Sequence, residues 1–126
     1  MARILLADDE TAVREFVRRA LDARGHEVIA VPDGLAALEA LGGEKPAFDL
    51  LLTDIRMPGM DGITLSLKAS RDWPDMPIMM MTGYADEEQR AHNLDTLIHC
   101  VVTKPFTLDE ICRAVDDVLA AGSPAA

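Results

Sequence analysis

The stretch Asp49-Leu-Leu-Leu-Thr-Asp-Ile-Arg-Met-Pro-Gly-Met-Asp-Gly62 decides the fold of this chain. Its apolar run from Leu50 to Leu52 is typical of a strand covered on both faces, as in a parallel sheet. The run ends at Thr53-Asp54, which places a carboxylate at the carboxyl end of the strand, where open α/β sheets bind their ligands. Pro58-Gly59 predicts a turn, and Asp61-Gly62 closes the loop before the next helix. We therefore expect Asp54 at the rim of a sheet, either as a functional carboxylate or as a residue that caps a turn.

The pairing of an apolar strand with a helix recurs along the chain. Apolar runs predict further strands at Arg3–Ala7, Val28–Val31, Ile78–Thr82 and Cys100–Thr103. Helical periodicity predicts a helix after each strand. The expected apolar stripes are Val13, Phe16, Val17, Ala20 and Leu21 in the first helix, Leu35, Leu38 and Leu41 in the second, Ile63 and Leu67 in the third, and Leu108, Ile111, Cys112, Val115, Val118 and Leu119 in the last.

Residues typical of helix termini mark where these helices begin and end. Arg24-Gly25 ends the first helix, Asp33 caps the second, Trp73-Pro74 ends the third, and Thr107 with Glu110 forms a capping box on the last. The segment from Asp86 to Asn93 is polar almost throughout, so we expect a weakly anchored helix there. Five alternations of strand and helix predict an α/β fold, with right-handed crossovers and a parallel sheet that carries helices on both faces.

The composition limits the kinds of partner and compartment. Its 12 basic and 22 acidic side chains give a net charge of −10, which disfavours direct binding to nucleic acid or to an anionic membrane and favours cationic partners. We find no signal peptide and no apolar run of membrane-spanning length. Cys100 and Cys112 have neither CxxC spacing nor a histidine cluster, so we expect buried, reduced thiols and a cytoplasmic location.

Polar side chains follow four of the predicted strands, namely Asp8 and Asp9, Asp54, Thr82, and Lys104. Because the carboxyl ends of parallel strands share one edge of the sheet, we expect these residues to converge. Carboxylates that lie close together repel one another unless a cation is bound, and oxygen ligands of high charge suit Mg²⁺. A lysine and a hydroxyl beside them suit a phosphoryl group. Asp54 stands alone in mid-sheet and is the best candidate nucleophile for an aspartyl-phosphate.

Each of these residues also has a purely structural interpretation. Asp8-Asp9-Glu10 suits the first turn of a helix because of the helix dipole, and Thr82 suits a strand because it is β-branched. Lys104 could be a solvated loop cation. Their joint order and spacing at strand ends favour a functional site.

The motifs Asp8-Asp9, Thr53–Gly62, Thr82-Gly83 and Lys104-Pro105-Phe106 together resemble those of the response-regulator receiver domain, the CheY-like phospho-acceptor module of two-component signalling. The resemblance covers Arg3 to Leu119. It implies a (βα)5 flavodoxin-like fold, a doubly wound five-stranded parallel sheet with strand order 2-1-3-4-5.

The same resemblance implies a role for each residue at the sheet edge. Asp54 would be phosphorylated by a histidine kinase or a histidine phosphotransfer protein. Mg²⁺ (or Mn²⁺) would bind to Asp8, Asp9, Asp54 and the backbone carbonyl of Arg56, and Thr82 and Lys104 would contact the phosphoryl oxygens. A cis peptide bond between Lys104 and Pro105 is expected as well.

Two features depart from the receiver pattern. The family usually has an aromatic residue three positions before the lysine, where this chain has Val101, and small residues ahead of that strand, where it has Asn93–Leu97. Val101 is too small for the inward swing that the aromatic residue makes when the threonine moves toward the phosphate. We expect Tyr84, two residues past Thr82, to take over part of this gating or to shield the acyl phosphate from water.

Three functions from different classes compete. The first is a switch of protein–protein interactions controlled by phosphorylation, with Ala85–Leu97 as the two-state element. The second is a phosphate shuttle in a phosphorelay. The third, an enzyme of a flavodoxin-like or haloacid-dehalogenase-like class, is disfavoured. No Ser/Thr/Gly-rich phosphate loop follows the first strand, and Arg56 stands two residues after Asp54, where a general acid–base is expected.

A closer resemblance concerns single-domain regulators. Met1–Ala7, Leu50–Ile55 and Val101 are similar to the CpdR type, which couples phosphorylation state to regulated proteolysis. We expect a receiver domain over residues 1–121, a flexible tail over residues 122–126, and no output domain after Leu119. The resemblance implies a protein that catalyses only its own phosphorylation and dephosphorylation.

Overall fold

The computed structural model describes residues 2–43, 48–83 and 98–121. The predicted helix at Asp86–Asn93, the proposed two-state element Ala85–Leu97, Tyr84 and the tail at 122–126 lie outside these ranges.

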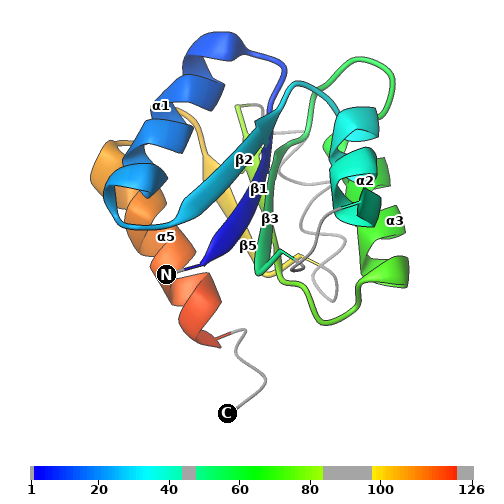
Figure 1. Cartoon of the computed structure of the whole chain (residues 1–126). Helices are drawn as coiled ribbons and strands as arrows, with labels where there is room; N and C mark the ends of the chain where they lie inside the picture. Colours follow the sequence, from blue (N-terminus) through cyan, green and yellow to red (C-terminus); the bar gives the residue numbers. More distant parts are fainter. Residues whose placement is uncertain (1, 44–47, 84–97, 122–126) are drawn as a thin grey trace.

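A five-stranded parallel sheet forms the centre of the molecule (Figure 1). Its strands are β1 (Arg3–Ala7), β2 (Glu27–Val31), β3 (Leu50–Asp54), β4 (Ile78–Thr82) and β5 (Cys100–Thr103). They lie in the order β2-β1-β3-β4-β5, and each neighbouring pair is parallel. The predicted strands and the strand order 2-1-3-4-5 are therefore confirmed.

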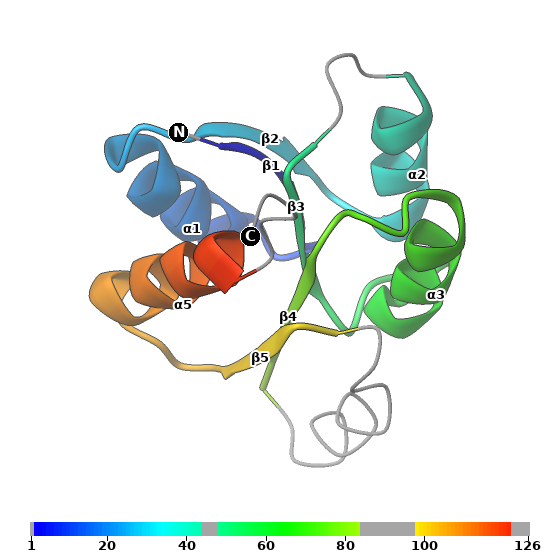
Figure 2. The same ribbon diagram turned by 90° about the horizontal axis from the view of Figure 1, so that it is seen from below.

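Helices cover both faces of this sheet. They are α1 (Thr11–Ala23), α2 (Gly34–Gly43), α3 (Gly62–Asp72) and α5 (Leu108–Ala121). Figure 2 shows α1 and α5 on one face and α2 and α3 on the other. Such an arrangement follows from right-handed crossovers between parallel strands, and it confirms the doubly wound, flavodoxin-like architecture.

The central strand, β3, and its neighbour β4 are buried along their whole length. Their side chains alternate between the two faces, as the pleat of a strand requires. Leu50 and Leu52 pack in the cluster that includes α1 and α5, whereas Leu51 packs with α2 and α3. In β4, Met79 and Met81 join the first cluster, and Met80 packs with Ile55 and Ile98 on the other side. Full burial of one such side chain contributes about 1.5–3 kcal/mol.

The predicted helix ends are confirmed by hydrogen bonds and dihedral angles. Gly25 follows α1 with a φ of 89°, and Asp33 Oδ1 accepts a hydrogen bond from Ala36 N at 2.8 Å. The capping box on α5 is reciprocal, since Thr107 N donates to Glu110 Oε1 at 2.8 Å and Glu110 N donates to Thr107 Oγ1 at 3.1 Å.

Several residues of the predicted apolar stripes are exposed, so those predictions are wrong in part. The exposed fraction is 41% for Phe16, 58% for Leu35, 45% for Leu67 and 46% for Leu108. On each helix, the part of the surface that packs against the sheet is narrower than the side that carries apolar residues. In α3 the fully buried residues are Gly62, Leu65, Ser66 and Ala69, whereas of the predicted pair Ile63 packs only partly buried against the core and Leu67 is exposed. Three of these four are small, which lets the helix lie close to the sheet.

Neither cysteine forms a disulfide bond; Cys112 is buried and Cys100 is half-buried. None of the helices in the described ranges is both long enough and apolar enough to cross a membrane.

Candidate functional site

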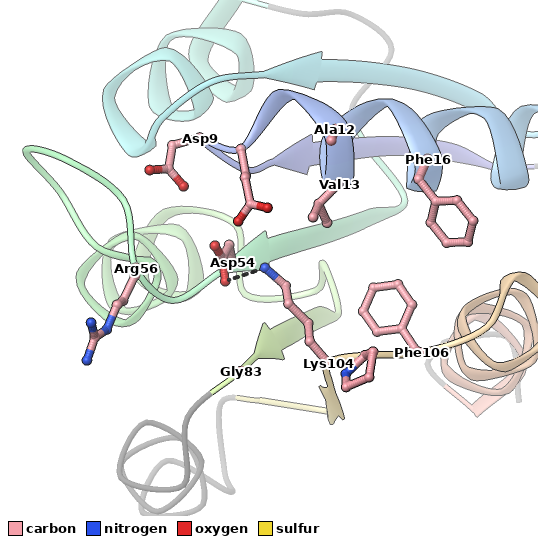
Figure 3. A pocket seen from close by; sticks show the side chains of 11 residues that line it. Asp9, Ala12, Val13, Phe16, Asp54, Arg56, Gly83, Lys104 and Phe106 are labelled. Carbon is pink, nitrogen blue, oxygen red and sulfur yellow. Dashed lines mark ion pairs between the residues drawn. The ribbon is translucent and has the colours of Figure 1, made fainter.

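Four of the predicted site residues meet at the carboxyl edge of the sheet. Carboxylate oxygens of Asp8, Asp9 and Asp54 lie within 4.8 Å of one another. Lys104 Nζ lies 3.3 Å from Asp54 Oδ1 and 3.6 Å from Asp8 Oδ2. Figure 3 shows the lysine reaching from the loop after β5 to Asp54. The expected convergence of strand-end residues is present in the fold.

Hydrogen bonds to three other residues, one in β2 and two at the start of α1, hold Asp8 in place. Its backbone N–H donates to Val31 O at 3.1 Å, its Oδ1 accepts from Glu10 N at 2.9 Å, and its backbone carbonyl accepts from Arg14 Nη1 at 2.7 Å. Its side chain is fully buried, yet Oδ2 accepts no hydrogen bond from any described residue. One carboxylate oxygen is thus presented to the site beside Lys104.

Asp54 is equally constrained at the end of β3, with only 6% of its surface exposed. Its Oδ1 accepts from Ile55 N at 2.9 Å, and its backbone carbonyl accepts from the hydroxyl of Thr53 at 2.9 Å. Gly62 packs directly against this carbonyl, and a Cβ there would collide with it. The loop after β3 is tied back by a hydrogen bond from Gly62 N to Ile55 O at 2.7 Å. These contacts fix where the Asp54 carboxylate points.

Thr82 and Lys104 lie beside each other at the ends of β4 and β5. Lys104 N donates to Thr82 O at 2.7 Å, and Thr82 is fully buried. The Lys104 side chain is 20% exposed. The peptide bond between Lys104 and Pro105 is cis, in the geometry that the resemblance implied.

The electrostatics of the site favour a bound proton or cation. Burial raises the pKa of Asp54 to about 6, the charge of Asp8 adds to this rise, and Lys104 opposes it. Burial also raises the pKa of Asp8. For Lys104, burial lowers the pKa, but the neighbouring Asp54 and Asp8 outweigh burial and the net change is upward. The lysine only partly neutralises the two buried carboxylates.

The donor set fits a hard divalent cation. It offers oxygen atoms from three carboxylates, and the buried Asp8 Oδ2 still lacks a hydrogen-bond partner among the described residues. Mg²⁺ binds through a small number of carboxylates and keeps part of its water shell. The exposed Arg56 side chain extends away from Asp54 in Figure 3, and the role of its backbone carbonyl stays a prediction.

A cavity of about 690 Å³ opens from the carboxylates along α1. Asp9 and Asp54 lie at its polar end, whereas Val13, Phe16 and Phe106 line its apolar wall (Figure 3). Glu10 also lines the cavity. The rings of Phe16 and Phe106 lie 6.4 Å apart between centroids, tilted by 34°. The cavity therefore joins a polar end at the carboxylates to an apolar wall.

Val101 is half-buried against Ile55, Met80 and Ile98. This small side chain stands where receivers usually carry an aromatic ring. Its predicted effect on switching and the gating role expected of Tyr84 stay predictions, because Tyr84 lies outside the described residues.

Some residues that shape the site were not singled out from the sequence. Arg14 and Thr53 each donate to the backbone carbonyl of a site aspartate, and Gly62 leaves room for one of these carbonyls. For Gly62, the Asp61-Gly62 pair in the sequence predicted that a loop closes there, but it did not predict the close approach of Gly62 to the backbone of Asp54. The contacts of Arg14 and Thr53 had no sequence signal.

Fold and site together define a class of protein. The chain belongs to the response regulator receiver domain family, whose model matches residues 4–116. It is thus a receiver domain of the kind found in two-component response regulators, as the motif resemblance implied.

Two curated relatives illustrate the range of the family. The response regulator receiver protein CpdR of Brucella abortus is 38% identical over 121 residues, which cover 96% of this chain and 99% of that protein. The response regulator MprA of Mycobacterium ulcerans is 36% identical over 109 residues, which cover 86% of this chain and 46% of MprA. The chain therefore spans about half the length of MprA and nearly the full length of CpdR.

Solved structures agree with this assignment. A CheY-like receiver domain protein from Methanospirillum hungatei matches with a TM-score of 0.88 at 30% identity, covering 97% of this chain and 96% of that one. The response regulator TrrA of Thermotoga maritima, solved in complex with Mg²⁺ and BeF, matches with a TM-score of 0.83 at 29% identity and covers 94% and 99% of the two chains.

Proposed function

We propose that this chain is a phospho-acceptor response regulator in which phosphorylation of Asp54, dependent on Mg²⁺, switches protein–protein interactions. The phosphoryl group would come from a histidine kinase or a histidine phosphotransfer protein. The observation that carries the proposal is the placement of Lys104 Nζ 3.3 Å from Asp54 Oδ1, next to two further carboxylates. A lone strand-end aspartate would need neither the lysine nor the acidic pair.

The residues divide the chemistry among them. A carboxylate oxygen of Asp54 forms the new bond to phosphorus while the bond from phosphorus to the donor's nitrogen breaks, and the leaving imidazole keeps the electron pair and takes a proton from water. Lys104 neutralises charge on a phosphoryl oxygen, and the Thr82 hydroxyl donates a hydrogen bond to another. Thr82 ends β4 and Lys104 directly follows the neighbouring β5, so both side chains start at the edge of the sheet that carries Asp54.

We propose that Asp8, Asp9, Asp54 and the backbone carbonyl of Arg56 hold Mg²⁺, with Mn²⁺ as a substitute. When bound, the ion supplies positive charge that offsets the repulsion between the carboxylates and the incoming phosphoryl group. Asp8 Oδ2, which accepts no hydrogen bond from a described residue, and the raised pKa values of Asp8 and Asp54 support this assignment. The Mg²⁺ and BeF in the TrrA structure support it by analogy.

A more specific role is favoured by one relative. Because CpdR of B. abortus aligns over 99% of its length, we propose a phosphate-controlled adaptor for regulated proteolysis as the first alternative for the output. A phosphate shuttle or sink in a phosphorelay is the second. In each case the receiver unit over residues 1–121 catalyses only its own phosphorylation and dephosphorylation. Val101 and Tyr84 would set the gating, and the two free thiols suit a cytoplasmic location.

The proposal is tested by intact mass spectrometry after incubation with Mg²⁺ and acetyl phosphate. We expect the parent to gain one phosphoryl group and to lose the gain when EDTA replaces Mg²⁺. Asp54→Asn should gain none, whereas Asp75→Asn, which changes an exposed aspartate before β4, should behave as the parent. Labelling of the Asp54→Asn variant, or no labelling of the parent by either acetyl phosphate or a histidine kinase, would contradict the proposal.

A second measurement separates a switch from a shuttle. For a switch, amide chemical shifts should change well beyond the loops around Asp54 when Mg²⁺ and beryllium fluoride are added. For a shuttle, those changes should stay local, and the label should pass rapidly to a histidine phosphotransfer protein.

A further inference from the structure

We infer that Arg14 is a positioning residue for the metal site, because it fixes the turn between β1 and α1 from which Asp8 and Asp9 project. The inference rests on the proposed Mg²⁺ site and names a residue outside its ligand set. Arg14 belongs to the second turn of α1 and is half-buried. Its Nη1 donates to the backbone carbonyl of Asp8 at 2.7 Å.

The hydrogen bonds of Asp8 show why this contact matters. Its N–H is bound by Val31, its Oδ1 by Glu10 N and its carbonyl by Arg14, while Oδ2 accepts no hydrogen bond from a described residue. The hydrogen bonds to the N–H, the carbonyl and Oδ1 of Asp8 thus fix the position of its fourth polar group, Oδ2. Among these three bonds, only the one from Arg14 comes from the side chain of another residue, and it is the one that a substitution of that residue can remove.

The start of α1 makes the turn dependent on this contact. Glu10 occupies the N-cap position, but its side chain makes no capping hydrogen bond to the described part of α1. The turn is closed instead by Asp8 Oδ1, which accepts from Glu10 N, and by Arg14, which ties the helix back to the carbonyl two residues before the N-cap. A charged donor makes a stronger hydrogen bond than a neutral one, and this bond is part-buried.

The positive charge of Arg14, taken by itself, would affect metal binding in the opposite direction to a positioning role. A guanidinium near a dication repels it, so its removal would strengthen Mg²⁺ binding if Arg14 acted through charge. If Arg14 acts by positioning, its removal loosens Asp8 and weakens binding. Loss of a residue that orients a metal ligand commonly weakens binding about 10- to 100-fold, and we expect about tenfold here. The sign of the change therefore separates the two roles.

The experiment measures Mg²⁺ affinity of the full chain by isothermal titration calorimetry for the parent, Arg14→Gln, Arg14→Lys and Arg18→Gln. Arg18 lies one turn further along α1 and pairs with Glu15 at 3.0 Å, so Arg18→Gln makes the same change of charge away from the turn. We expect about tenfold weaker binding for Arg14→Gln, an intermediate value for Arg14→Lys, which keeps a donor, and parental or slightly tighter binding for Arg18→Gln. If Arg14→Gln does not fold, Arg14→Met keeps the apolar stem and takes its place.

Labelling by acetyl phosphate gives an independent readout. In Arg14→Gln the half-saturating Mg²⁺ concentration should rise about tenfold, while the rate at saturating Mg²⁺ should stay near that of the parent. Parental or tighter Mg²⁺ binding by Arg14→Gln, even with a lowered melting temperature, would overturn the role of Arg14. A parent that binds no Mg²⁺ would instead refute the metal site in the proposed function.

Discussion

Replacement of Asp54 by asparagine should stabilise the protein in the absence of divalent cations. Burial raises the pKa of Asp54 to about 6 from an ordinary value of 3.8, so the folded state holds this proton more tightly than the unfolded state. Since each tenfold change in proton affinity is worth about 1.4 kcal/mol, ionisation of Asp54 costs the folded state about 3 kcal/mol at high pH. Asparagine has nearly the same shape and no charge, and its Oδ1 can still accept the hydrogen bond from Ile55 N.

The sign of the effect depends on pH in a defined window. Below about pH 3.8 the Asp54 carboxyl is protonated in both states, and it contributes no difference. Between about pH 3.8 and 6 the unfolded chain ionises first, so the parent loses stability as pH rises. Above about pH 6 Asp54 is ionised in both states, and the folded state bears the full free-energy cost of its buried charge. The advantage of the variant over the parent should therefore grow from about 0.5 kcal/mol at pH 4 to about 3 kcal/mol at pH 8.

The assay is urea denaturation followed by far-UV circular dichroism at several pH values in EDTA, with equal slopes required for the comparison. Asp75→Asn serves as the control and should stay within about 0.5 kcal/mol of the parent. Addition of Mg²⁺ at about 100 times its dissociation constant should stabilise the parent by about 2.7 kcal/mol and narrow the gap to Asp54→Asn. Equal stability of parent and variant at pH 8 in EDTA would refute the reasoning, because it would mean that the buried charge is already fully compensated.

Three further substitutions test other parts of the site and fold. Lys104→Met leaves two buried carboxylates without their cation, so the free energy of unfolding at pH 7.5 in EDTA should fall by about 2 kcal/mol and recover in part with Mg²⁺; an unchanged urea midpoint would contradict this. Gly62→Ala puts a Cβ against the carbonyl of Asp54, so it should lower the free energy of unfolding by about 2–4 kcal/mol and slow labelling by acetyl phosphate. Gly42→Ala is the control, because its Cβ would meet no described atom within 4 Å. In the same urea titration this control should be neutral or stabilising by up to about 1 kcal/mol. Thr107→Ala removes half of the capping box and should cost about 1 kcal/mol without changing the rate at which Asp54 is labelled; a slower rate would link the start of α5 to the site.

Much of this structure could be predicted from local patterns because parallel sheets impose simple rules. An apolar run such as Leu50–Leu52 marks a strand with two covered faces. The residue that follows such a strand must lie at the shared edge, which is why Asp8, Asp54 and Lys104 could be placed together from the sequence alone.

The exposed apolar residues could not be predicted from periodicity. Phe16 and Leu108 have the right spacing for a buried stripe, yet they are 41% and 46% exposed. Spacing defines the apolar side of a helix, but the width of the covered arc depends on where the sheet ends and how closely the helix approaches it. In α3 the small residues Ser66 and Ala69 decide that approach, and a hydrophobic pattern gives them little weight.

The hydrogen bonds that orient the site residues could not be predicted from local sequence patterns either. The contact from Arg14 to the Asp8 carbonyl depends on the angle at which α1 leaves β1. Similarly, the collision that any side chain at Gly62 would have with Asp54 depends on how tightly the loop after β3 folds back. Both are consequences of three-dimensional packing between segments whose individual structures were predicted correctly.

The alternation of methionines in β4 supplies natural spectroscopic reporters. The methyl groups of Met79 and Met81 lie in the layer with α1 and α5, and that of Met80 lies on the other side of the sheet with Ile55 and Ile98. Isotopic labelling of methionine methyl groups would therefore place neighbouring NMR probes in separate layers without any mutation. Resonances that move together on phosphorylation would indicate a shift of the whole sheet, and movement of Met80 alone would localise the response to one layer.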